Sequence, residues 1–132
     1  MRLGKFALKL PNLRDGAHRH RVALTLTAIL AITIAYLTLT PQSLPVVSGG
    51  DKLHHVIGFA ALSLPAATLY RRALIWLLPS AIAFGGIIEI IQPYVNRQGE
   101  WADFGADAIG AILGVSLGLF LRYIFRNRFT SG

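Results

Sequence analysis

The sequence predicts an all-α membrane protein, a bundle of four transmembrane helices with both ends of the chain in the cytoplasm. Three observations lead to this prediction. Of the 132 residues, 54% are hydrophobic and only 14% are charged, whereas a soluble domain usually carries about 25% charged residues. The apolar residues gather in four long blocks. The short segments between these blocks alternate between a basic and a nearly uncharged character.

Each apolar block is long enough to cross a bilayer, because a hydrocarbon core ~30 Å thick needs about 20 apolar residues in a helix. Helices are expected because each backbone group in lipid must find its hydrogen-bond partner inside the protein. The predicted spans are residues 22–40, 53–70, 73–92 and 102–125, with cytoplasmic tails at 1–21 and 126–132. No small-x-small cleavage site follows the first block, which favours an uncleaved span over a signal peptide.

The basic residues fix the predicted orientation. Eleven of the 13 Lys and Arg residues fall in the two tails, at the inner end of the fourth span and at Arg71–Arg72, and only Lys52 and Arg97 fall on the other side. Because basic connections stay in the cytoplasm, both ends of the chain are predicted to lie there. The same rule accounts for the net charge of +7, so we expect the lipid bilayer as a partner and no nucleic acid.

Polar residues gather at the predicted outer ends of three spans. They are Asp51, Lys52 and His55 in the second span, Glu89 and Gln92 in the third, Asp103 and Asp107 in the fourth, and Arg97 in the connection. An ionised carboxylate facing lipid costs roughly 2.5 kcal/mol or more, so these groups should face neighbouring helices. Asp51 alone can be read as a helix cap. Ionisable groups inside a membrane are first read as a functional site.

Glycines continue the polar stripe of the fourth span. Gly110, Gly114 and Gly118 follow its carboxylates on one helical face, and Gly85 precedes Glu89 by one turn. Small residues let membrane helices approach closely, so these glycines are predicted to lie at helix contacts. Ile112, on the opposite face of the fourth span, should face lipid.

These residues resemble the VanZ-like family of integral membrane proteins over roughly residues 50–120. The matching pieces are Asp51-Lys52-x-x-His55-x-x-x-Phe59, Glu89-x-x-Gln92, Arg97, and Asp103 followed by Gly110 and Gly114. One departure is Asp107, where the family pattern often has Asn. The resemblance implies a four-helix protein of the bacterial cytoplasmic membrane, linked to the cell envelope or to resistance against glycopeptide antibiotics. It implies no common reaction.

The leading functional hypothesis is a site that binds an envelope ligand from the outer leaflet, such as a lipid-linked wall precursor or a glycopeptide-type antibiotic. Lys52, His55 and Arg97 would meet phosphate or carboxylate groups of this ligand, and the carboxylates of the cluster would accept hydrogen bonds.

Other hypotheses remain open. An enzyme could use Glu89, His55 or Asp103 in catalysis, with Glu89 or His55 as general base and Mg²⁺ or Ca²⁺ held by carboxylates. No HExxH, GxSxG or P-loop pattern supports this reading. A small transporter or assembly partner, acting as a homo-oligomer, is a further alternative. The chain has no cysteine, which excludes thiolate sites, and the sequence assigns no metal ligands and no cofactor.

Overall fold

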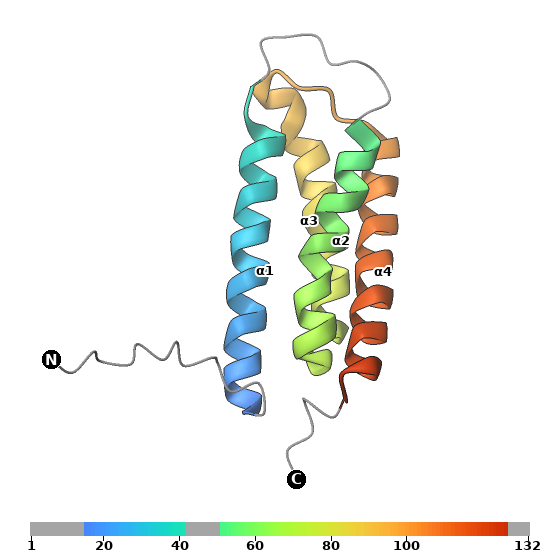
Figure 1. The fold of residues 1–132 in the computed structure, drawn as a ribbon. Coiled ribbons are helices and arrows are strands. Elements are labelled where there is room, and N and C mark those ends of the chain that lie inside the picture. Colours follow the sequence, from blue (N-terminus) through green and yellow to red (C-terminus); the bar gives the residue numbers. More distant parts are fainter. Residues whose placement is uncertain (1–14, 42–50, 127–132) are drawn as a thin grey trace, which may run out of the picture.

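The computed structural model describes residues 15–41 and 51–126, except for the side chain of Asp51, and shows four long helices (Figure 1). The elements are α1 (Gly16–Leu39), α2 (Asp51–Leu69), η1 (Arg71–Ala73), α3 (Leu74–Ile91), η2 (Gln92–Val95) and α4 (Trp101–Ile124). No strand occurs in this part of the chain. The all-helical prediction is therefore confirmed for it, while residues 1–14 and 127–132 of the predicted tails lie outside the described residues.

The helices match the predicted spans closely, except at the start of α1. α3 covers Leu74–Ile91, within the predicted 73–92, and α4 is shifted by one residue from 102–125. α1 begins at Gly16 rather than at residue 22, because the carboxylate of Asp15 accepts a hydrogen bond from the backbone N–H of Ala17 at 3.0 Å. This N-cap extends the helix into the basic segment that the sequence assigned to the tail.

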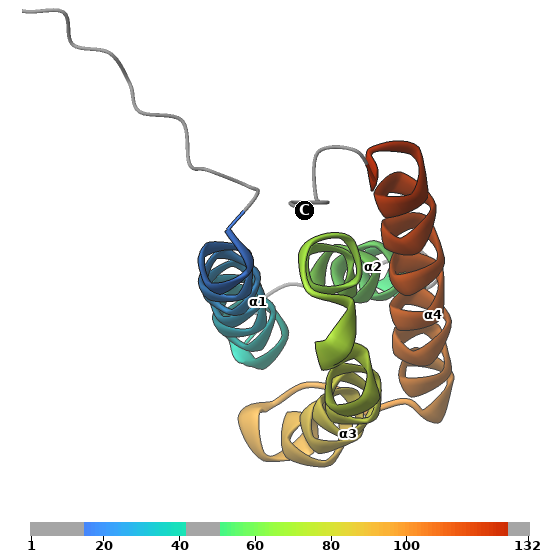
Figure 2. The same ribbon diagram turned by 90° about the horizontal axis from the view of Figure 1, so that it is seen from below.

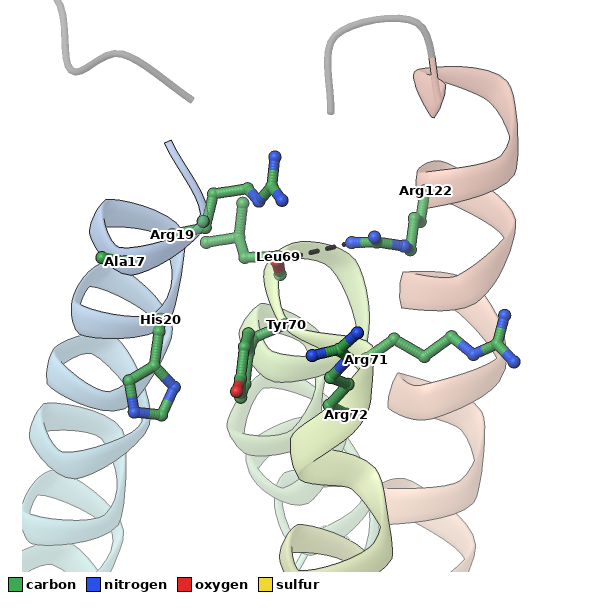
Figure 3. Close-up of a pocket in the computed structure, with 9 residues that line it drawn as sticks. Ala17, Arg19, His20, Leu69, Tyr70, Arg71, Arg72 and Arg122 are labelled. Atoms are coloured by element: carbon green, nitrogen blue, oxygen red, sulfur yellow. Dashed lines mark hydrogen bonds between the residues drawn. The ribbon is translucent and has the colours of Figure 1, made fainter. Parts of the chain in front are cut away.

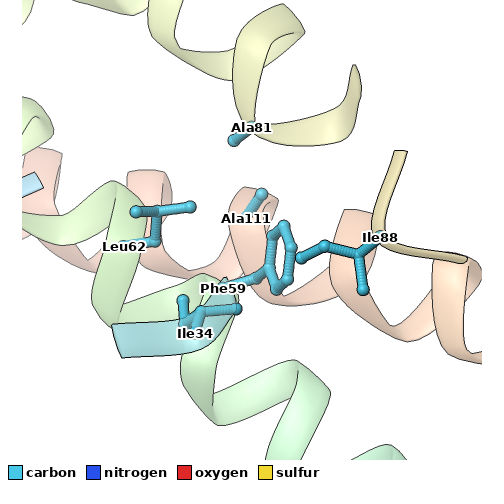
Figure 4. Packing of buried hydrophobic residues seen from close by; sticks show 6 residues of the cluster. All are labelled: Ile34, Phe59, Leu62, Ala81, Ile88 and Ala111. Atoms are coloured by element: carbon cyan, nitrogen blue, oxygen red, sulfur yellow. The ribbon is translucent and has the colours of Figure 1, made fainter. Parts of the chain in front are cut away.

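α2 is the central helix, with α1, α3 and α4 packed around it (Figure 2). The hydrophobic core is built where the four helices meet (Figure 4). It consists of Ile34 from α1, Phe59 and Leu62 from α2, Ala81 and Ile88 from α3, and Ala111 from α4.

Three segments of the described chain are long and apolar enough to cross a membrane: Gly16–Leu39, Arg71–Val95 and Trp101–Ile124. α2 does not meet the same criterion. The outward faces of the bundle carry large apolar side chains, including Ile32, Ile75 and Ile112. Such a surface suits lipid, and the structure agrees with a multi-pass membrane protein.

The glycines of α4 lie against the backbone of α2. A Cβ atom added to Gly110 would lie 2.9 Å from Cα of Val56, and one added to Gly114 would lie 2.8 Å from Cα of Ala60. At Gly118 it would lie 2.9 Å from the carbonyl oxygen of Leu64. This close approach brings the polar ends of the two helices together.

Candidate functional site

A buried histidine–carboxylate pair joins α2 to α4. Nδ1 of His55 lies 2.8 Å from Oδ1 of Asp107, and the two residues are only 5% and 0% exposed. With Asp107 ionised, the carboxylate can only accept, so Nδ1 carries the proton of this hydrogen bond. The pair thereby orients the imidazole and makes Nε2 the nitrogen with the lone pair.

Gly85 of α3 makes room for this pair. A Cβ atom added to Gly85 would lie 2.7 Å from Oδ2 of Asp107 and 3.0 Å from its Cβ. The absence of a side chain at Gly85 therefore lets the carboxylate sit between α3 and α2. Three helices thus define the position of one buried carboxylate.

Glu89 lies near the C-terminal end of α3 and is also buried. Its Oε2 accepts a hydrogen bond from the backbone N–H of Glu100 at 2.8 Å. With the amide of Gln92 turned so that its nitrogen faces acceptors, Nε2 of Gln92 donates to the same Oε2 at 3.0 Å and to the carbonyl oxygen of Gln98 at 3.2 Å. Gln92 is 1% exposed, so this amide is part of the interior of the site.

A tight turn folds the connection back over Glu89. Asn96 adopts a left-handed conformation with φ of 59°, and the N–H of Arg97 donates to the carbonyl oxygen of Gln92 at 3.0 Å. Gly99 then passes so close to α3 that an added Cβ would lie 3.3 Å from the carbonyl carbon of Glu89. The turn thereby delivers the backbone N–H of Glu100 to the Glu89 carboxylate.

Asp103 lies in the first turn of α4 and is buried, while Lys52 forms the rim above it. Nζ of Lys52 is 3.2 Å from Oε2 of Glu100 and 3.6 Å from Oδ1 of Asp103. The hydrogen bond to Glu100 and the nearby charge of Asp103 raise the pKa of Lys52, which keeps this amine positively charged. The rim therefore combines one ammonium group with the exposed carboxylate of Glu100.

Three buried groups converge beneath this rim. His55, Glu89 and Asp103 each offer one ligand atom, and the three atoms lie within 4.8 Å of one another. Ligand atoms around one ion at ~2.1 Å lie within about 4.2 Å of each other, so small side-chain rotations would complete such a site. The donor set of one imidazole and two carboxylates suits Zn²⁺ or Mn²⁺ better than an oxygen-only ion such as Mg²⁺.

Several oxygens in this cluster need a partner. Oε1 of Glu89 and Oδ2 of Asp107 are enclosed and have no hydrogen-bond donor among the described residues, and enclosed Oδ1 of Asp103 has only the Lys52 ammonium at 3.6 Å. A buried oxygen without a donor costs roughly 1–3 kcal/mol, and more if it is charged. A cation would compensate this cost, and the bond from His55 to Asp107 is the outer-shell support typical of a metal-binding histidine.

The residues that the sequence singled out have different places in the structure. His55, Glu89, Gln92, Asp103 and Asp107 form the buried cluster, and Lys52 is at its rim. The side chain of Arg97 is directed to the end of α1, where Nη1 donates a long hydrogen bond of 3.4 Å to the carbonyl oxygen of Thr40. The side chain of Asp51 lies outside the part of the chain that the structure describes.

Sequence reasoning considered Mg²⁺ or Ca²⁺ held by carboxylates, but it missed Glu100 and the place of His55 in a mixed ligand set with Glu89 and Asp103. Glu100 supplies both a backbone donor to Glu89 and a carboxylate to Lys52. The available signal was its position directly before the fourth span, next to Gly99. The equal predicted depth of His55, Glu89 and Asp103 was the signal for a shared ligand set.

Comparisons with protein-family models, with curated proteins and with solved structures found no match for this chain.

Proposed function

We propose that this chain is a four-span protein of the bacterial cytoplasmic membrane, with both ends of the chain in the cytoplasm. The direction of the helices supports a fourth span. α1 and α3 run the same way in Figure 1, so α2 returns along the full length of the bundle between them. If α1 and α3 cross the bilayer, α2 crosses it as well.

The distribution of charge supports the orientation. Arg19, Arg71, Arg72 and Arg122 lie at the end where α1 begins and α4 ends. Lys52, Glu89 and Asp103 lie at the opposite end. Basic groups retained on the cytoplasmic side would put the buried cluster near the outer face.

Reporter fusions test this topology. Alkaline phosphatase, which is active only outside the cytoplasm, should be active when fused after Ser48 or after Gly99. Fusions at Arg72 and Gly132 should be inactive. The reverse pattern would overturn the orientation and place the cluster at the inner face.

We further propose that the buried cluster binds a divalent cation, and that this ion holds a phosphate or carboxylate group of an envelope ligand. The observation that carries this proposal is the convergence of His55, Glu89 and Asp103 from three helices within 4.8 Å. A bulky lipid-linked precursor or glycopeptide cannot contact the enclosed carboxylates directly, whereas a small ion can. A ligand headgroup would reach the ion from the rim at Lys52, whose positive charge attracts an anion.

The family resemblance of residues 50–120 supports an envelope ligand in particular, because the VanZ-like proteins are linked to the bacterial envelope. The proposed ligands are a lipid-linked wall precursor and a glycopeptide-type antibiotic. Both present anionic groups at the outer leaflet, the level at which the cluster would lie.

A metal-assisted hydrolase is the second candidate, and the His55–Asp107 pair favours it. An imidazole held by a buried carboxylate is suited to act as general base. In that case Glu89 and Asp103 would hold the ion without His55, and Nε2 of His55 would accept a proton from a water that attacks the terminal phosphorus of a pyrophosphate, with the lipid phosphate as the leaving group. The test is an assay for phosphate released from a lipid-linked pyrophosphate. Release by the unmodified protein that is lost in Asp107→Asn would distinguish catalysis from binding.

Metal titration tests the proposed ion site. The protein, purified in detergent and treated with a chelator, is heated with Zn²⁺, Mn²⁺, Mg²⁺ or Ca²⁺ while its unfolding is followed. An ion at 100 times its Kd stabilises the folded state by about 2.7 kcal/mol, so we expect Zn²⁺ or Mn²⁺ to raise the Tm by several degrees.

The matched variants are Glu89→Gln and Asp103→Asn, which should remove the metal-induced rise. Glu100→Gln is the control, because it removes a carboxylate from the rim but leaves the backbone donor to Glu89 in place. If no ion raises the Tm of the unmodified protein, the ion site is wrong. If all three substitutions diminish the metal-induced rise in Tm equally, the rise reflects a general loss of negative charge and not a specific ion site.

A further inference from the structure

A second polar feature lies at the opposite end of the bundle from the buried cluster. A pocket of about 510 Å³ opens between the start of α1, the end of α2, η1 and the end of α4 (Figure 3). Its polar lining consists of Arg19, His20, Tyr70, Arg71, Arg72 and Arg122. The volume falls within the range of small-molecule sites.

The walls of this pocket are held in place by specific contacts. Nη1 of Arg122 donates to the carbonyl oxygens of Thr68 at 3.0 Å and Leu69 at 3.4 Å, at the end of α2. These bonds fix the guanidinium at the pocket wall. On the other side, the rings of His20 and Tyr70 pack edge to face, with centroids 4.3 Å apart. Two arginines on different helices, Arg19 and Arg122, lie on either side of Leu69 in Figure 3.

The charged side chains that line the pocket are all positive. Within residues 15–41 and 51–126, four guanidinium groups line it and no acidic residue does. Asp15, the nearest acidic residue in sequence to this lining, is exposed and caps α1 through the N–H of Ala17. One ring nitrogen of His20, Nδ1, is enclosed and has no hydrogen-bond partner among the described residues. Like charges around one cavity repel each other, and a bound anion would offset that repulsion.

From these contacts we infer that the pocket binds a phosphate group, and that an anionic phospholipid of the inner leaflet supplies it. Guanidinium groups match the geometry of phosphate oxygens, with two parallel N–H donors for each arginine. The proposed topology places the pocket at the cytoplasmic face, where anionic headgroups are concentrated. Soluble phosphate offers the same chemistry and is the alternative source.

Orientation alone does not account for this arrangement. The positive-inside rule requires basic residues on the cytoplasmic side, but it does not require them to surround one cavity. Arg21 and Arg126 satisfy the rule from exposed positions that do not line the pocket. They therefore provide a control with the same loss of charge at the same end of the bundle.

Native mass spectrometry of the full chain tests the proposal. The protein is extracted into detergent micelles that contain equal amounts of phosphatidylglycerol and phosphatidylcholine, and retained lipids are counted. Phosphatidylglycerol should be retained selectively. Arg71→Gln combined with Arg72→Gln should lower that retention by roughly tenfold or more, because it removes two of the four guanidinium groups that would contact the phosphate inside the pocket. Arg21→Gln combined with Arg126→Gln should leave it unchanged.

A second arm separates the two sources of phosphate and guards against misfolding. The Tm of each variant is measured with added phosphatidylglycerol, with inorganic phosphate and with neither. A rise with phosphatidylglycerol that is lost only in the Arg71/Arg72 variant supports the lipid. A rise with inorganic phosphate alone would overturn the lipid as the source. Equal losses in both double variants, or no rise with either anion, would overturn the pocket as a phosphate site.

Discussion

The contact between α4 and α2 makes a quantitative prediction about Gly114. In Gly114→Ala, the new Cβ would lie 2.8 Å from both Cα and the carbonyl carbon of Ala60, whereas 3.4 Å is the start of ordinary contact. The carbonyl oxygen of Ala60 would lie closer still, so the two backbones must separate by more than the roughly 0.6 Å that the two carbon contacts require. Overpacking of this kind typically costs about 1–3 kcal/mol.

Gly105→Ala is the matched control on the same helix. A Cβ added there meets nothing within 4 Å. Both substitutions gain the same helix propensity, about 1 kcal/mol for glycine to alanine. The difference in unfolding free energy between the two variants therefore isolates the overpacking, and Gly114→Ala should be less stable than Gly105→Ala by about 1–3 kcal/mol.

Thermal unfolding in detergent, together with the monodisperse yield from size-exclusion chromatography, measures this difference. Gly114→Ala should unfold at a lower temperature than the unmodified protein, and Gly105→Ala at an equal or higher one. Equal Tm values for the two variants would refute the close approach of α2 and α4. The position of Asp107 beside His55 would then be in question as well, because the same contact sets it.

Four further substitutions separate packing from function. Ile112→Leu changes a side chain that is 52% exposed on the outer surface, so its folded yield should match that of the unmodified protein, whereas Gly114→Leu should lower the yield sharply. Asp107→Asn should weaken metal binding in the titration by roughly 10–100-fold, because it removes the outer-shell partner of His55. Glu89→Gln keeps the shape of the side chain but removes its charge. It should abolish an envelope phenotype, such as altered glycopeptide sensitivity, at normal protein levels, and a full phenotype would leave the cluster with a structural role only.

The helices could be predicted from the sequence because membrane burial leaves a strong local pattern. Long apolar blocks set the extents of α3 and α4 to within one or two residues. The orientation of the carboxylates toward neighbouring helices could also be predicted. Asp103 and Asp107 continue the glycine stripe on one face of the fourth span. A charge facing lipid is costly, and this cost selects the inward orientation.

Contacts that depend on a turn or on long side chains could not be predicted in this way. The backbone N–H of Glu100 reaches Glu89 only because Asn96 turns the chain back, and no local periodicity encodes that turn. Arg97 has the reach to lie over the cluster, yet its side chain lies toward Thr40. The arginine pocket was missed for a related reason, since charge counting identifies a side of the membrane and not a shared cavity.

α2 is the long helix of the described chain that does not meet the criterion for a membrane span, and its packing bears on both sites. A spanning helix must be apolar where it meets lipid. α2 packs against α1, α3 and α4, so only part of its surface would meet lipid in the proposed four-span bundle. Its enclosed positions hold His55, Ser63, Ala66 and Ala67, which suit close helix contact better than lipid contact. The same enclosure shields His55 at one end of α2 and presents the carbonyl of Leu69 to Arg122 at the other. α2 therefore connects the two polar ends of the bundle.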